Sequence, residues 1–357
     1  MLYPPRPNEL LSSWIIRNSI IQGSDPMGWV YGFWGEWRAW TRDIDRYLPK
    51  ERAVELSRFS RLSLESISEM TLTPITIATL GKMPKINRAW EWIVPTGRRN
   101  RHVVSGLQFC PECLKEDPTF FPRDWRLSWH TQCSKHSIRF HDRCDRCAMP
   151  FSPHLIDFTA PHTYLCSRCG NDLRTMHTHP SSKQSILFQE KLEEVLASPE
   201  AIQKHYPQWS LTTTEDFFLF LRDILILSVI LSGNEDRFED WQVCLFAAKR
   251  FSRFLSKAGL SFDMRSVEER ESLLLIAFQL LENTPENLIK SLRHIQLTQG
   301  IFTRQTFPHS PYMHRLLSTL PIPATVTRRK MKAPHTSKEP KSPDAVKEQM
   351  AAIKRFL

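Results

Sequence analysis

The stretch FCPECLKEDPTFFPRDWRLSWHTQCSKHSIRFHDRCDRC, residues 109–147, holds five of the eight cysteines of the chain. Together with CSRC at 166–169, it forms four short knuckles, three of them Cys-x-x-Cys and one Cys-x-x-His. A knuckle of this kind presents two ligands to one metal ion. The pattern therefore predicts two closed tetrahedral centres, one with three cysteines and a histidine and the other with four cysteines. The predicted ligands are Cys110, Cys113, Cys133, His136, Cys144, Cys147, Cys166 and Cys169.

Zinc is the expected cofactor, with two ions per chain, because thiolate and imidazole ligands in closed sets suit this metal. Such ions staple a small domain and leave no position for a substrate, so catalysis at the metal is not expected. Two pairings are open. Sequential pairing of neighbouring knuckles closes two loops of similar length and is favoured. Cross-braced pairing of the first knuckle with the third, and of the second with the fourth, is the alternative.

Charge and hydropathy restrict the class of protein. The 357 residues carry 48 Lys and Arg against 38 Asp and Glu, and the net charge of +10 favours polyanionic partners such as nucleic acid. No secretory signal is expected, and the most apolar run, residues 217–231, contains Arg222 and Asp223. That run predicts a buried helix rather than a membrane span. We therefore expect a cytoplasmic protein without a membrane partner, where paired cysteines hold metal.

The knuckles and their surroundings resemble the TniQ family of transposition proteins, which includes TnsD. The matching motifs are Cys-Pro-x-Cys-Leu at 110–114, Trp-Arg-Leu at 125–127, Cys-x-Lys-His at 133–136 and Asp-x-Cys-x-x-Cys at 142–147. The opening PRPNELLSSWIIRNS is also similar to that family's first residues. The resemblance covers about residues 4–175.

The resemblance implies a non-catalytic adaptor for transposon target selection. Such proteins connect a target-recognition complex to an AAA+ ATPase, which recruits the transposase to target DNA. The recognised element is a CRISPR effector complex with guide RNA in one branch and an attachment-site DNA in the TnsD branch. Only about half of the chain follows the knuckles. This favours the CRISPR-associated type, with the sequence-specific attachment-site reader as the alternative; a homodimer is a further implied partner.

A mainly α-helical chain of four parts is expected. Residues 1–97 form a helix-turn-helix-like helical domain, 98–175 a tandem zinc-finger domain, 176–321 a C-terminal helical domain and 322–357 a basic flexible tail. No glycine-rich phosphate loop of the Walker type is found, so ATP hydrolysis must come from another protein. The chain is therefore predicted not to be an enzyme.

Helix boundaries follow from capping signals. Asn8 is the predicted N-cap of the first helix and Gly23 its stop, while Asp25-Pro26 begins a second helix. Residues 50–59 and 64–71, with Ser63 as N-cap, give a helix-turn-helix outline whose second helix has no Arg or Lys, which favours protein binding over DNA reading. Further helices are expected near 184–198, 214–232, 235–257, 266–282, 285–297 and 309–320, the pair at 266–297 forming either a second helix-turn-helix-like unit or part of a bundle.

Partner contacts are predicted from composition. Residues 1–60 combine near-neutral charge with tryptophans that are either core or exposed anchors for the ATPase, namely Trp14, Trp29, Trp34, Trp37 and Trp40. Trp125 and Trp129 are expected to pack the first finger, and Cys244 is expected to be a core residue. Basic residues that are either solvated or contact phosphate are Arg98, Arg99 and Arg101 before the knuckles and Arg328, Arg329 and Lys330 in the tail, which ends in a predicted amphipathic helix.

Overall fold

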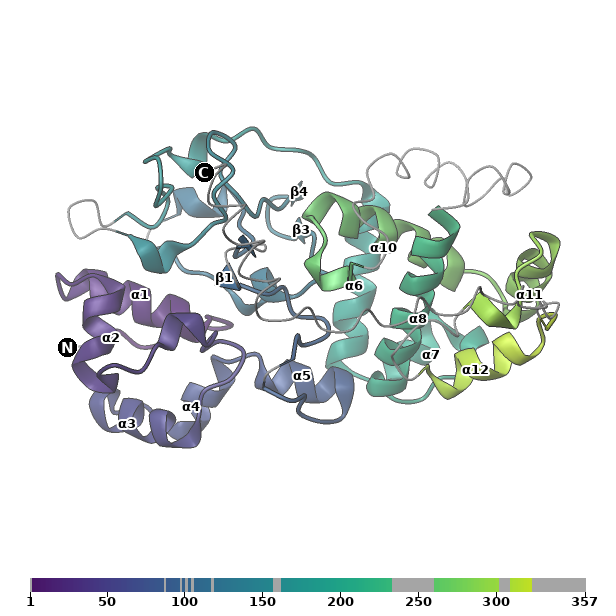
Figure 1. The fold of residues 1–357 in the computed structure, drawn as a ribbon, viewed down its shortest axis with the longest axis horizontal. Coiled ribbons are helices and arrows are strands. Elements are labelled where there is room, and N and C mark those ends of the chain that lie inside the picture. The colour runs from purple at the N-terminus through teal and green to yellow at the C-terminus, as the bar shows by residue number, and fades with distance from the viewer. Residues whose placement is uncertain are drawn as a thin grey trace, which may run out of the picture.

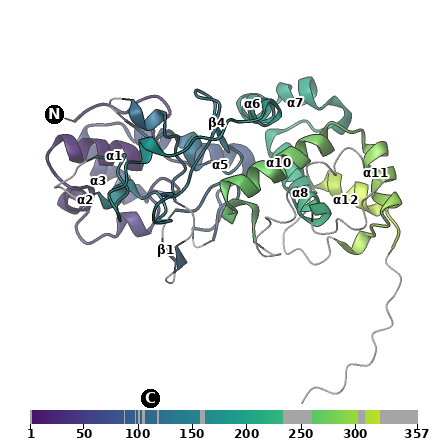
Figure 2. The same cartoon turned by 90° about the horizontal axis from the view of Figure 1, so that it is seen from above.

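The computed structural model describes residues 2–86, 88–96, 106–116, 119–156, 162–232, 260–301 and 309–322, together with the backbone of 98–99 and 102–103. Within these residues the fold is mainly α-helical, as the sequence predicts. The N-terminal and C-terminal helices lie at opposite ends of the long axis (Figure 1). The region that contains the four knuckles is largely irregular. It lies against the N-terminal helices, and its short strands lie beside the C-terminal helices (Figures 1 and 2).

Four helices form the N-terminal group: α1 (Leu11–Ile21), α2 (Pro26–Trp34), α3 (Lys50–Ser60) and α4 (Leu64–Glu69). Asp25 accepts hydrogen bonds from the backbone N–H groups of Met27 and Gly28, which confirms it as the cap of α2. Ser63 caps α4 in the same way, and the predicted helix pair at 50–71 is present. The group packs around its own apolar core, which includes Trp14, Trp34, Leu56 and Ile67.

The predicted cap of the first helix, Asn8, is wrong. Leu10 precedes α1, and no side chain caps the helix there. Asn8 instead has a φ of 61° and uses its side chain across the molecule. Its Nδ2 donates to Asp124 at 2.8 Å, and its Oδ1 accepts from Arg123 at 2.9 Å. Asparagine tolerates this left-handed backbone better than most residues, so the residue type suits the position, but a contact across 115 residues leaves no local signal.

The sequence did not predict α5 (Thr73–Leu80). It lies between the two helical groups (Figures 1 and 2) and packs on α8 (Thr214–Ser232), α6 (Lys183–Ala197) and α4. Its end at Gly81 has a φ of +66°, the left-handed conformation that commonly ends a helix. Among the described residues, the remaining α-helices are α7 (Glu200–His205), also unpredicted, α10 (Val267–Leu281), α11 (Pro285–His294) and α12 (Pro311–Ser318).

Helix α8 has the predicted bounds and is buried, as the apolar run at 217–231 indicated. Its Asp223 is fully buried and accepts hydrogen bonds from His309 and from the backbone N–H of Ser310. In the part of the chain that the structure describes, no helix is both long and apolar enough to cross a bilayer. The predicted helix at 235–257, Cys244 and the tail from residue 323 onward lie outside the described residues.

A second and larger apolar core runs from Trp90 through the knuckle region into α6, α8 and α10. Trp92 and Trp129 meet edge to face, with ring centroids 5.8 Å apart, and both contact Phe218 of α8. The core therefore continues across residues 175 and 176, where the sequence suggested a division between domains. Its position fixes the knuckles against the C-terminal helices.

Candidate metal centres

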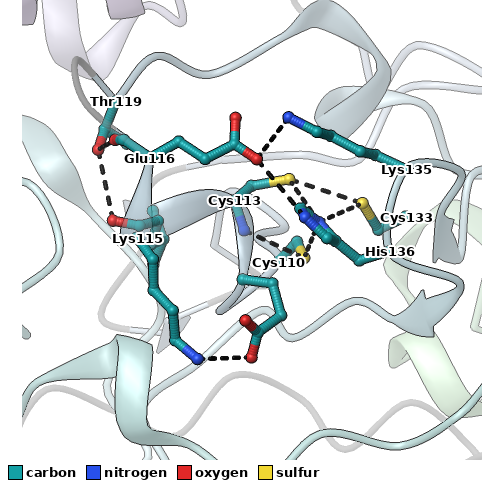
Figure 3. A network of polar contacts seen from close by, with 10 residues as sticks. Cys110, Cys113, Lys115, Glu116, Thr119, Cys133, Lys135 and His136 are labelled. Atoms are coloured by element: carbon teal, nitrogen blue, oxygen red, sulfur yellow. Dashed lines mark hydrogen bonds and ion pairs between the residues drawn. The ribbon is translucent and has the colours of Figure 1, made fainter.

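The first candidate centre is built by a short hairpin and an irregular loop. Strand β3 (Gln132–Cys133) pairs antiparallel with β4 (Ile138–Arg139), and the turn between them carries His136. The other knuckle, residues 110–113, ends at the first residue of a 3-10 helix, Cys113–Lys115. Three thiol sulfurs and one imidazole nitrogen converge within 4.8 Å of one another (Figure 3), from Cys110, Cys113, Cys133 and His136.

The distances within this set match a tetrahedron around one ion. Zinc–sulfur bonds of about 2.3 Å imply sulfur–sulfur edges of about 3.8 Å, and shorter edges to nitrogen. The Sγ atoms of Cys113 and Cys133 are 3.6 Å apart. Nδ1 of His136 lies 3.3 Å from Sγ of Cys113 and 3.5 Å from Sγ of Cys110 and of Cys133. Nδ1 is therefore the nitrogen of His136 that would bind the ion.

The second candidate centre gathers four sulfurs, from Cys144, Cys147, Cys166 and Cys169. The two knuckles repeat one backbone pattern. Cys144 donates its N–H to Met149 O and accepts from Ala148 N–H, both at 2.9 Å, and Cys166 does the same with Asn171 and Gly170. Sulfurs of the two knuckles are 3.7 and 3.6 Å apart, close to the tetrahedral edge expected for zinc.

The ligands come together in the sequential pairing, as favoured from loop lengths. Sulfur separations near 3.6 Å exclude disulfides, and all seven cysteines that the structure describes are free thiols. Two closed donor sets of soft sulfur with one imidazole fit zinc, which takes four such ligands in structural sites. Such centres are structural rather than catalytic in type, because four protein ligands leave no coordination position for a substrate.

A carboxylate supports the first centre from outside. Glu116 Oε1 lies 3.5 Å from Nε2 of His136 and 2.6 Å from Nζ of Lys135 (Figure 3). A carboxylate facing the second nitrogen of a ligand histidine orients the ring and raises its basicity. In the second centre, the backbone N–H of Asn171 lowers the pKa of the Cys169 thiol to about 7, whereas burial raises the pKa of the Cys144 and Cys166 thiols. The spacing of the knuckles gave no sign of Glu116.

A buried ion-pair network joins the first finger to the N-terminal helices. Arg126 is almost fully buried and donates to Asp43 at 2.7 and 2.9 Å and to Asp45 at 3.2 Å. Burial raises the pKa of Asp45 to about 6, although Arg126 and the hydrogen bonds from Ser12 act in the opposite direction. Arg126 belongs to the Trp-Arg-Leu motif, so the arginine of that motif holds two parts of the fold together.

Polar contacts also join the knuckle region to the C-terminal part. Arg270 of α10 is fully buried and donates to Ser128 O and to Gln108 Oε1. Asp263 accepts from Ser128 Oγ at 2.7 Å and from the N–H of Trp92 at 3.0 Å. Trp125 and Trp129 are buried beside these contacts, which confirms that they pack the finger. The two candidate centres are thus embedded in the larger core.

The predicted partner residues separate into two groups. Of the two alternatives, core residue or exposed anchor, Trp14 and Trp34 take the first: they are 0 and 3 % exposed and fill the N-terminal core. Trp29, Trp37 and Trp40 are half-buried. Among the predicted nucleic-acid residues, Arg98 and Arg99 form strand β1 (Arg98–Arg99), which pairs with β2 (His102–Val103). The others, Arg101, Arg328, Arg329 and Lys330, lie outside the described residues.

The comparison with known families agrees with the motifs. The TniQ family model matches residues 1–140. The chain carries a TniQ domain. The match covers less than half of the 357 residues. It includes the ligands of the first candidate centre and ends before those of the second. No curated protein matches the chain. The match supports the resemblance drawn from the motifs, and a TniQ domain indicates a protein associated with transposition.

Proposed function

We propose that this protein is a non-catalytic adaptor for transposon target selection. It would link a guide-RNA CRISPR effector complex to an AAA+ transposition regulator and so bring the transposase to target DNA. The observation that carries the proposal is the TniQ domain at residues 1–140. Support also comes from the metal centres, whose ligand sets are closed and structural in type.

The aromatic surface of α2 and α3 is the proposed contact for the ATPase. Phe59 is 47 % exposed and stacks on Phe33, with ring centroids 4.9 Å apart and ring planes at 21°. Trp29 meets both rings edge to face. Trp37 is half-buried, meets Trp34 edge to face and lies under the guanidinium of Arg52 at 5.5 Å. Part-exposed aromatic side chains backed by a rigid core are favourable anchors for a protein partner.

The test is binding of the full-length protein to the AAA+ ATPase of the same mobile element. We expect Trp37→Ala with Phe59→Ala to weaken binding by about tenfold or more, since aromatic anchors typically contribute over 1 kcal/mol each. Leu187→Ala on α6 is the matched control, because Leu187 is an apolar side chain 45 % exposed on a different element. Failure of the unaltered protein to bind the ATPase would reject the adaptor role.

The second candidate function is direct recognition of an attachment-site DNA, as in the TnsD branch. It is favoured by the net charge of +10. Against it, the exposed part of α4 offers no Arg or Lys to read guanine. A footprint on one DNA sequence by the isolated protein at physiological salt would favour this function over the adaptor.

A further inference from the structure

Residues 1–97 have a near-neutral net charge, but their basic and acidic residues are unevenly distributed along the sequence. Twelve basic residues stand against ten acidic ones, yet no Asp or Glu occurs between Glu69 and Glu91. Lys82, Lys85 and Arg88 fall in this interval, and all three side chains are exposed. Within the described part of the chain none of the three has a carboxylate partner. Their charge is therefore available to a ligand.

Backbone hydrogen bonds hold the described residues of the loop that carries these cations. Gly81 ends α5 in the left-handed conformation, and Arg88 N–H donates to Lys85 O at 3.0 Å, which closes a turn. The guanidinium of Arg46 donates to the carbonyl oxygens of Ile86 and Arg88, at 3.0 and 3.1 Å. These hydrogen bonds hold the turn against the loop that follows α2, so the exposed cations of the two loops lie on neighbouring segments.

The loop that follows α2 adds to the same charge. It carries Arg38 and Arg42, both exposed. Its two aspartates, Asp43 and Asp45, turn inward to the buried Arg126 and do not neutralise them. We define the basic strip as Arg38, Arg42, Lys82, Lys85 and Arg88. Its two loops, residues 35–48 and 81–90, retain only one exposed carboxylate, that of Glu36.

We propose that the basic strip binds the sugar-phosphate backbone of a nucleic acid. Exposed cations that form no ion pair supply the sequence-independent contacts that position a protein on a polyanion. The exposed carboxylate of Glu215 lies beside Gly81, but among the described residues it forms no ion pair with Lys82, Lys85 or Arg88. Arginine matches phosphate geometry through two N–H groups, and lysine acts as a point charge. The inference deepens the proposed function by placing the nucleic-acid contact of the adaptor on the TniQ domain, at residues different from those that the sequence suggested.

The test measures binding of the full-length protein to a random-sequence DNA duplex and to an RNA duplex, each by fluorescence anisotropy between about 50 and 200 mM salt. The variant replaces Lys82, Lys85 and Arg88 by Gln. Each phosphate contact contributes about 0.9 to the slope of log affinity against log salt, so we expect the slope to fall by about 2–3 and the affinity at low salt by at least about tenfold. The duplex that binds more tightly identifies the source of the phosphates.

The control removes the same charge elsewhere, with Gln at Lys183, Lys204 and Lys290, which are exposed on α6, α7 and α11. Circular dichroism verifies that both triple variants are folded. The proposal is overturned if the control loses as much affinity as the strip variant, if the strip variant binds like the unaltered protein, or if no salt-dependent binding occurs. None of these outcomes involves the ATPase, so the adaptor role is judged separately.

Discussion

At the scale of single residues, one backbone conformation recurs in the metal knuckles. The residue four positions after the first ligand has a positive φ in three of the four: 53° at Ser137, 55° at Ala148 and 67° at Gly170. In each, its N–H donates to the carbonyl of the first ligand cysteine. Only glycine adopts this conformation without a penalty from its Cβ. Serine and alanine at two of these positions therefore keep strain in the native state.

The strain predicts reciprocal substitutions in the second centre. Ala148→Gly should raise the free energy of unfolding by about 0.5–1 kcal/mol, since relief of the strain exceeds the added entropy of the unfolded chain. Gly170→Ala should lower it by about 1 kcal/mol. A Cβ at Gly170 would meet no atom within 4 Å, so this substitution reports on the backbone alone. Urea unfolding in the presence of zinc measures both, and changes of equal sign would contradict the explanation.

At the scale of elements, the knuckles and most helices could be predicted from the sequence. Ligand spacing and capping residues are local signals, and Asp25, Ser63 and Ser266 cap helices as their residue types indicate. The short helices α5 and α7 have no N-terminal side-chain cap, although Pro74 in the first turn of α5 and Gly81 at its end are local signals for that helix. The N-cap position of α5 is Leu72, which makes no capping bond, and the helix is held by its packing on α8. Tertiary contacts of that kind are invisible in a pattern of neighbours.

The predicted metal centres are tested by counting ions. We expect two zinc ions per chain, falling to one in Cys113→Ser and in Cys169→Ser, because a lost thiolate opens a four-ligand set. Cys113→Ser should also unfold at clearly lower temperature, since the first centre lies within the larger core beside Trp125. Cys244→Ser, outside both ligand sets, is the control and should retain two ions. Plasma emission analysis that finds one ion or none in the unaltered protein would reject the assignment.

At the scale of the whole molecule, buried charges join segments that are far apart in the sequence. Arg126 reaches Asp43 and Asp45, and Asp263 reaches Ser128 and Trp92. Neither contact could be predicted, because a charged residue that is buried in a distant interface looks like a surface residue when only its neighbours are considered. For the same reason the sequence could not show that the aspartates near the basic strip turn inward.

The titration of the buried Asp263 predicts that the stability of the whole molecule depends on pH. Burial raises its pKa from 3.8 to about 6, so the folded protein binds a proton that the unfolded chain releases, and stability falls as pH rises through this window. Asp263→Asn removes the titration. Relative to the unaltered protein, the variant should gain about 2–3 kcal/mol in free energy of unfolding between pH 4 and pH 7. Urea unfolding at several pH values measures the difference, and a difference independent of pH would contradict the prediction.

The aromatic contact of Trp92 and Trp129 with Phe218 bears on how this protein can be dissected. Both tryptophans lie within residues 1–140, whereas Phe218 belongs to α8. A fragment cut at residue 140 would expose these rings to water and leave the carbonyl of Ser128 without Arg270. The segment that matches the TniQ family therefore ends at residue 140, whereas the packed core to which it belongs continues into the C-terminal helices. Chimeras between transposon systems should exchange the TniQ domain together with α6, α8 and α10, because the recognisable module is only part of what must stay intact.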